Sequence, residues 1–172
     1  MKPKASIFLD CEWDYKRKVF IFGCCFDEKT VFQLHGKFLN RENIEKFLSG
    51  IETIYFFGPD ISVIEKNFDM NLRQNFQCVN LLTMIQHFAP RLHSYKLHHI
   101  EKSAGINRKI TQYKDNIWFL MDDWKSRNPK KKHRCLEYNA EDVRNLYLIK
   151  NWFFKKYKVK KSDIPNFCLK TS

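Results

Sequence analysis

The chain has 172 residues and a formal net charge of +12, with 44% hydrophobic and 16% aromatic residues. These values favour a single soluble domain with a substantial apolar core. The first apolar run stops at Asp10 and is too short for a signal peptide or a membrane helix, so we expect a cytoplasmic protein without a membrane partner. The six cysteines include no C-x-x-C pair, which argues against a zinc site and favours reduced thiols in the core.

Three strands joined by hairpins are predicted at the start of the chain. Residues 6–12 and the unbroken apolar run 19–26 have strand composition, and the polar segment 13–18 between them is typical of a turn. A third strand is expected over residues 30–35. The continuous apolar character of residues 19–26 indicates a strand that is covered on both faces.

Helices alternate with two further strands in the remainder of the chain. The strands are expected at residues 53–57 and 77–79, and the helices at residues 41–48, 60–67, 81–88, between Ser94 and Gly105, at 117–124 and from 139 to about 154. Asn128 and Pro129 indicate the start of a basic loop before the last helix. This order predicts an α/β fold with a central mixed five-stranded sheet flanked by helices, in a domain over residues 1–156 followed by a basic tail over residues 157–172.

Two acidic motifs near opposite ends of the chain predict one metal site. Asp10 and Glu12 end the first strand two residues apart, so both side chains point to the same face. Tyr138 and Asp142 are four residues apart, which places them on one face of a helix, together with the apolar stripe that should face the core. Carboxylates that converge in this way repel each other unless they hold a hard cation such as Mg²⁺ or Mn²⁺.

Asp60 is the third candidate acid, because it follows the fourth predicted strand directly, at the edge of the sheet where α/β proteins bind ligands. Its alternative role is an ordinary helix N-cap. Asn139 and Asp142 have a similar alternative, a capping-box-like helix start without any catalytic role.

The surplus of basic residues favours a polyanionic partner. Lys and Arg number 31 against 19 Asp and Glu, and they are concentrated in residues 125–134 and 155–161. The alternative is that lysines only keep an aromatic-rich protein soluble. Trp13 and Tyr15 follow Glu12 and could stack a terminal base, or could simply pack on their own domain. The basic residues that could follow a phosphate backbone are Lys125, Arg127, Lys130, Lys131, Lys132 and Arg134.

These motifs resemble those of a known enzyme family. Asp10-x-Glu12, Asp60 and Tyr138-x-x-x-Asp142, in this order and on these elements, resemble the motifs of the DEDD 3′–5′ exonucleases of the ribonuclease H-like superfamily. The tyrosine is typical of the tyrosine subclass, since the histidine subclass has its histidine at the position that Glu137 occupies here.

A narrower resemblance is to the YprB-like branch of this superfamily. It rests on Ser94-Tyr95-Lys96-Leu97, Gly105-Ile106-Asn107-Arg108, Trp118 and Tyr138-Asn139-Ala140-Glu141-Asp142-Val143. The match spans about residues 6–154 and implies a ribonuclease H-like fold.

The resemblance also implies a mechanism with two divalent ions, Mg²⁺ or Mn²⁺, and no small-molecule cofactor. Asp10 would bridge the two ions, Glu12 and Asp142 would complete the shell of the first, and Asp60 would hold the second largely through water. Tyr138 would orient the attacking water with help from Glu12. The implied substrate is a nucleic acid, DNA or RNA, that is single-stranded or offers a 3′ end.

The chain departs from the family pattern at two places. Asn80 stands where many relatives have an acid, and Phe57-Gly58-Pro59-Asp60 lacks the Asn and Phe often found around this Asp. Asp69, at the other end of the same predicted helix, is a poorer substitute for Asp60. Two other functions remain open: an inactive nucleic-acid-binding or adaptor module on the same scaffold, and a structure-specific endonuclease.

Overall fold

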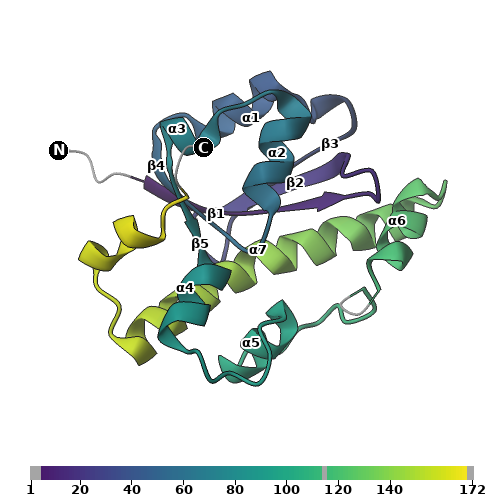
Figure 1. Ribbon diagram of the computed structural model, residues 1–172. Coiled ribbons are helices and arrows are strands. Elements are labelled where there is room, and N and C mark those ends of the chain that lie inside the picture. Colours follow the sequence, from purple (N-terminus) through teal and green to yellow (C-terminus); the bar gives the residue numbers. More distant parts are fainter. Residues whose placement is uncertain (1–4, 114–115, 170–172) are drawn as a thin grey trace.

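One five-stranded mixed sheet forms the centre of the protein. The structure, a computed structural model, describes residues 5–113 and 116–169. The strand order is β3-β2-β1-β4-β5, in which β1, β2 and β3 pair antiparallel while β1, β4 and β5 pair parallel (Figure 1). The strands are β1 (Ala5–Trp13), β2 (Val19–Cys25), β3 (Val31–His35), β4 (Ile51–Phe56) and β5 (Gln77–Asn80). The predicted α/β fold with three hairpin-linked strands is therefore confirmed.

Helices cover both faces of the sheet. The shorter helices α1 to α3 lie on one face, and the long helix α7 crosses the other (Figure 1). The helices are α1 (Arg41–Leu48), α2 (Asp60–Phe68), α3 (Leu72–Asn75), α4 (Leu81–Phe88), α5 (Leu97–Ser103), α6 (Ile117–Lys125) and α7 (Pro129–Tyr157), with 3₁₀ helices η1 (Gly36–Phe38) and η2 (Lys161–Phe167). In the described ranges, no helix has both the length and the apolar character needed to cross a membrane.

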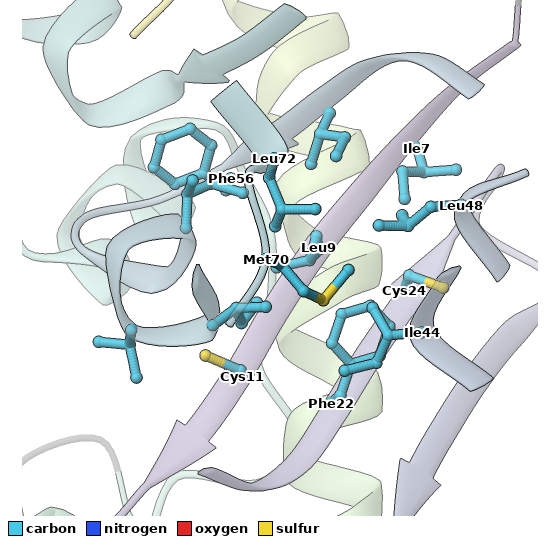
Figure 2. Close-up of a cluster of buried hydrophobic side chains, with 14 of the residues drawn as sticks. Ile7, Leu9, Cys11, Phe22, Cys24, Ile44, Leu48, Phe56, Met70 and Leu72 are labelled. Carbon is cyan, nitrogen blue, oxygen red and sulfur yellow. The ribbon is translucent and has the colours of Figure 1, made fainter. Parts of the chain in front are cut away.

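The central strand β1 separates the two layers because its side chains alternate between the faces. Ile7, Leu9 and Cys11 join the cluster that contains Ile44 and Leu48 of α1 (Figure 2). Phe8, which lies between Ile7 and Leu9 in the sequence, points to the opposite face and belongs to the other cluster. Its ring packs edge-on against that of Tyr147 of α7, with 5.3 Å between centroids. The even-numbered positions of β1 therefore face α7.

Helix α7 begins ten residues earlier than the sequence predicted. The segment expected to be a basic loop forms its first turns, from Pro129 onward. The Asn128 side chain accepts a hydrogen bond from the Lys130 backbone N–H, and proline at the first helical position has the φ angle that a helix needs. Asn139 consequently lies within the helix and is fully buried, so the predicted helix start at this residue is wrong, and the alternative capping role does not apply.

The segment after α7, expected to be a basic tail, folds back onto the sheet as far as it is described. Cys168 forms an isolated antiparallel bridge with Val79 of β5, and the Leu169 N–H donates to the Cys78 carbonyl at 2.9 Å. The ring of Phe167 packs against Phe88 of α4, with 5.6 Å between centroids. These contacts cover the outer edge of β5.

Gly23 of β2 allows α7 to approach the sheet. It pairs with Asp10 in the sheet, and a Cβ atom added at Gly23 would lie 2.1 Å from the Asn139 Oδ1 atom. Asn139 cannot move freely, because its Oδ1 accepts from Gln33 Nε2 at 2.9 Å and its Nδ2 donates to Asp10 Oδ2 at 2.8 Å. Position 23 therefore requires glycine, because any larger residue would collide with the Asn139 side chain.

We predict that Gly23→Ala lowers the free energy of unfolding by about 1–3 kcal/mol, because the added methyl group overpacks the contact between β2 and α7. Denaturant titration measures this change. The double variant with Asn139→Ala should lose less than the sum of the two single losses, since the smaller side chain makes room for the methyl group. Strictly additive losses would contradict this account of the contact.

Candidate metal centre

Three carboxylates from distant parts of the chain meet between β1 and α7. Asp10 and Glu12 lie on the face of β1 that α7 covers, and Asp142 lies on the buried face of α7. One ligand oxygen from each of the three lies within 4.8 Å of the other two. The structure thus brings together the two acidic motifs that the sequence identified, at a spacing that suits a shared divalent cation.

Asn139 holds the first of these acids in place. Its side-chain amide donates to Asp10 Oδ2 at 2.8 Å and in turn accepts from Gln33 of β3. Gln33 also donates to the Leu136 carbonyl of α7 at 2.8 Å. This chain of hydrogen bonds ties Asp10 to a neighbouring strand and to the helix, so its position is fixed by the fold.

Burial of these carboxylates without a cation raises the electrostatic free energy of their charged forms. It raises the pKa of Asp10 from 3.8 to about 6, although the Asn139 hydrogen bond and the charge of Arg108 act in the opposite direction. Burial, together with repulsion from Asp10, raises the pKa of Glu12 and Asp142 well above the usual range of carboxyl groups. Without a cation, the folded protein therefore disfavours the charged form of these carboxyl groups relative to water.

A divalent cation fits this donor set. Among the described side chains, Glu12 Oε1 and Asp60 Oδ2 are buried oxygens without a hydrogen-bond partner. A buried acceptor without a partner costs about 1–3 kcal/mol, and more when it is charged. A hard cation with oxygen ligands would supply both the missing partner and the missing positive charge.

Asp60 lies beside the three-carboxylate group but outside it. It is the first residue of α2, it is 4% exposed, and its Oδ1 accepts from the Cys11 thiol at 3.5 Å. Burial and repulsion from Asp10 raise its pKa well above the usual range. The residue before it, Pro59, occupies the cap position, and Asp60 makes no capping hydrogen bond. Asp69, at the far end of α2, is fully exposed and does not join the site.

Asn80, at the position where the resemblance led us to expect an acid, has a structural role. Its Oδ1 accepts from the backbone N–H groups of Gly58 and Leu82, at 3.2 and 3.0 Å, and its Nδ2 donates to the Gly58 carbonyl at 3.1 Å. Gly58 has a φ of +80°, which favours glycine. Asn80 therefore fixes the turn that leads into Asp60.

Tyr138 lies one helical turn before Asp142 and is 8% exposed. Its ring packs edge-on against Tyr113, with 5.3 Å between centroids, and the Arg108 guanidinium lies 4.9 Å from the ring centroid. Burial, with the negative charges of Asp142 and Glu12, raises the pKa of the Tyr138 hydroxyl. The hydroxyl is thus kept protonated, as a hydrogen-bonding group next to the acids.

A buried ion-pair network beside Asp142 was not predicted from the sequence. Arg108 donates from Nη2 to Asp142 Oδ1 and to Glu101 Oε1, the latter at 2.6 Å, and from Nε to Glu101 Oε2 at 3.0 Å. Asn145 Nδ2 donates to Glu101 Oε1 at 2.8 Å. The only sequence signal was indirect: Arg108 ends one of the motifs that resemble the YprB-like branch.

An exposed aromatic surface lies where α6 meets the turn after β1. Tyr15 is 60% exposed and Trp118 of α6 is 54% exposed, with 6.5 Å between their ring centroids. The ammonium groups of Lys16 and Lys125 lie 5.6 and 5.5 Å from the Tyr15 centroid. Trp13, the other predicted stacking residue, is only partly exposed and packs against the core. Trp118 is a member of this surface that sequence reasoning did not identify as a contact residue.

The predicted basic residues are all exposed, and they lie on α6, the following turn and the first turns of α7 rather than in a loop. At least four of them have partners within the described protein: Lys125 lies near the Tyr15 ring, and the other three make the following contacts. Lys131 pairs with Asp123 at 2.8 Å, Arg134 donates to Gln112 at 3.3 Å, and Lys132 lies over the Trp124 ring at 5.8 Å.

We predict that a divalent cation stabilises the protein more at about pH 8 than at about pH 5. Because the pKa values of the site carboxyl groups are higher in the folded than in the unfolded chain, the contribution of these groups to the stability of the metal-free fold falls as pH rises above about 4, through about 6 for Asp10. Saturating Mn²⁺ should raise the melting temperature at pH 8 by about 5–10 °C.

The matched variants are Glu12→Gln and Asp69→Asn. Glu12→Gln should raise the melting temperature of the metal-free protein at pH 8, because a buried charge is removed, and should diminish the effect of Mn²⁺. Asp69→Asn removes an exposed carboxylate away from the site and should change neither. A Mn²⁺ effect that is equal at both pH values and in both variants would contradict metal binding by these acids.

Comparisons with known proteins identify the family. A family model described as RNase_H superfamily matches residues 7–154. Among solved structures, the chain is similar to NrnC of Brucella melitensis, with a TM-score of 0.63 and 14% sequence identity, over 95% of this chain and 83% of that one, which supports the fold. The search of curated proteins found no match. The family match covers most of the chain, so this protein belongs to the RNase_H superfamily.

Proposed function

We propose that this protein is a metal-dependent 3′–5′ exonuclease of the tyrosine-bearing DEDD class, in its YprB-like branch. The observation that carries the proposal is the convergence of Asp10, Glu12 and Asp142 with unpaired, buried oxygens beside them. Tyr138 lies one turn before Asp142, which is the arrangement that the tyrosine subclass requires. The RNase_H superfamily match supports a nuclease activity.

The residues divide into two groups around the proposed ions, Mg²⁺ or Mn²⁺. Asp10, Glu12 and Asp142 would hold one ion, and Asp10 with Asp60 would hold a second. When bound, such ions lower the pKa of a metal-bound water to about 7, so that hydroxide is available near neutral pH. They also neutralise the negative charge that builds on the phosphate. The protein fixes its ligands in advance through Asn139, so little reorganisation is needed during reaction.

Tyr138 would orient the attacking water. Its raised pKa keeps the hydroxyl protonated, so it can donate a hydrogen bond and accept another without acting as a base. The edge-on contact with Tyr113 and the packing of Arg108 restrict the ring. We therefore assign Tyr138 a positioning role.

The proposed substrate is a nucleic acid with a single-stranded 3′ end. Tyr15 and Trp118 expose ring faces on which unpaired bases could stack, and Lys16 and Lys125 place positive charge beside them. Helix α6, which carries Trp118, packs near the site, because its Leu120 belongs to the same buried cluster as Tyr138 of α7. The net charge of +12 favours a polyanion.

A binding or adaptor module without activity is the second candidate. The observation that favours it is the ion pair between Arg108 and Asp142, in which a guanidinium already neutralises one of the proposed ligands. A structure-specific endonuclease would use the same acids, and it differs in the products that it makes.

We predict that the protein shortens a 5′-labelled single-stranded oligonucleotide stepwise in Mg²⁺ or Mn²⁺, and that a chelator stops this. Asp10→Asn and Asp142→Asn should each slow cleavage on the order of 10²- to 10³-fold or more, because each removes a charged ligand. Tyr138→Phe should slow it about 10²-fold while leaving the Mn²⁺-induced rise in melting temperature in place. Asp69→Asn is the control and should cleave at the parental rate.

The products decide between the candidates. Internal cuts would identify an endonuclease, and retention of the oligonucleotide without cleavage would identify a binding module. Parental rates in both Asp10→Asn and Asp142→Asn would show that the assigned acids are not the catalytic ones.

We predict that the double variant Tyr15→Ala, Trp118→Ala weakens binding of single-stranded oligonucleotide roughly tenfold or more, because two stacking faces are lost. Fluorescence anisotropy in the presence of a chelator measures binding without cleavage. Phe38→Ala is the matched control, since Phe38 is 57% exposed and lies beside Lys37, on η1. An equal loss in this control, or no loss in the double variant, would contradict the assignment of this surface.

A further inference from the structure

Arg108 is a buried cation beside the proposed metal site, in contact with Asp142. Its side chain is 6% exposed, as is that of Asp142, and the side chain of Glu101 is 2% exposed. Nη2 is shared between the two carboxylates, and Nη1 is buried without a hydrogen-bond partner. Arg108 therefore occupies one oxygen of a residue that the proposed function assigns to the metal.

In the metal-free protein, the positive charge of Arg108 compensates negative charge in the site. The carboxylates of Glu12 and Asp142, which are buried, lie together with that of Asp10, which is partly buried, and unpaired carboxylates cost free energy in such a setting. Arg108 supplies positive charge to Asp142 by a direct hydrogen bond, and to Asp10 at longer range. A divalent cation at the same carboxylates would supply the same compensation, and a cation next to a guanidinium would be repelled by it.

Arg108 does not depend on Asp142 for its position. Two of its hydrogen bonds go to Glu101, which Asn145 also holds. The backbone beyond Arg108 is anchored to α7 as well, because Glu141 accepts from the N–H groups of Lys109 and Ile110, at 2.6 and 2.9 Å. Arg108 can thus release Asp142 and still keep a charged partner.

We infer that Arg108 is a built-in competitor of the divalent cation, pairing with Asp142 in the metal-free protein and yielding it to the metal. This inference rests on the proposed function, which places a metal ion at Asp142. On metal binding, Asp142 exchanges a guanidinium for the cation, while Arg108 remains bound to Glu101. The metal affinity of the site is accordingly lower than its acids alone would give, and Arg108 sets that affinity.

The test is to measure Mn²⁺ binding by calorimetry in the full chain, without substrate. Arg108→Gln should bind Mn²⁺ on the order of tenfold more tightly, because the competing charge-assisted hydrogen bond is gone. Arg108→Lys retains the positive charge and should stay closer to the parental affinity. Circular dichroism and thermal melts show whether each variant is folded.

A second variant separates competition from instability. Arg108→Gln leaves Glu101 buried without its partner, so the double variant Glu101→Gln, Arg108→Gln removes both charges of the pair and leaves the net charge unchanged. This variant should also bind Mn²⁺ more tightly than the parental protein. If Arg108→Gln fails to fold, the double variant carries the test.

The outcomes distinguish this inference from the proposed function. Unchanged or weaker Mn²⁺ binding in the folded variants, with binding by the parental protein, would overturn the role of Arg108 alone. Binding by the variants but not by the parental protein would support the competition and contradict a metal-dependent activity of the natural chain. Absence of binding in every folded protein would overturn both.

Discussion

The structure depends on how three buried carboxylates, of Glu12, Asp60 and Asp142, and the partly buried carboxylate of Asp10 are compensated. Asp10, Glu12, Asp60 and Asp142 lie where burial raises the pKa of each, and each also repels its neighbours. Asn139 stabilises one of them by a hydrogen bond, and Arg108 stabilises another by an ion pair. Buried oxygens of Glu12 and Asp60 are left without partners among the described residues. Bound cations would supply the missing partners and the missing positive charge.

The fold assembles this site with two simple devices. Alternation along β1 separates Asp10 and Glu12, which face α7, from Cys11, which belongs to the opposite core. The absence of a side chain at Gly23 then lets α7 come close enough for Asn139 to reach Asp10. The proposed catalytic residues therefore lie on rigid elements, a central strand and a long helix.

Local patterns in the sequence were sufficient to predict the sheet and to identify the two acidic motifs. Alternation in residues 6–12 and the four-residue spacing of Tyr138 and Asp142 are short-range features, and the structure keeps both. The start of α7 was missed because a run of lysines after Pro129 suggested a loop, whereas lysine is a good helix former and Asn128 is a helix cap. The contacts of Arg108 with Glu101 and Asp142 could not be predicted, because partners 7 and 34 residues away meet only through tertiary packing.

The most direct measurement is anomalous diffraction at the manganese edge from crystals of this protein grown with Mn²⁺. We expect an anomalous peak within ligand distance of the carboxylates of Asp10, Glu12 and Asp142, and a second near Asp60, with Arg108 turned from Asp142 toward Glu101. Crystals that show the same carboxylates with no manganese between them, and with Arg108 still bound to Asp142, would contradict it.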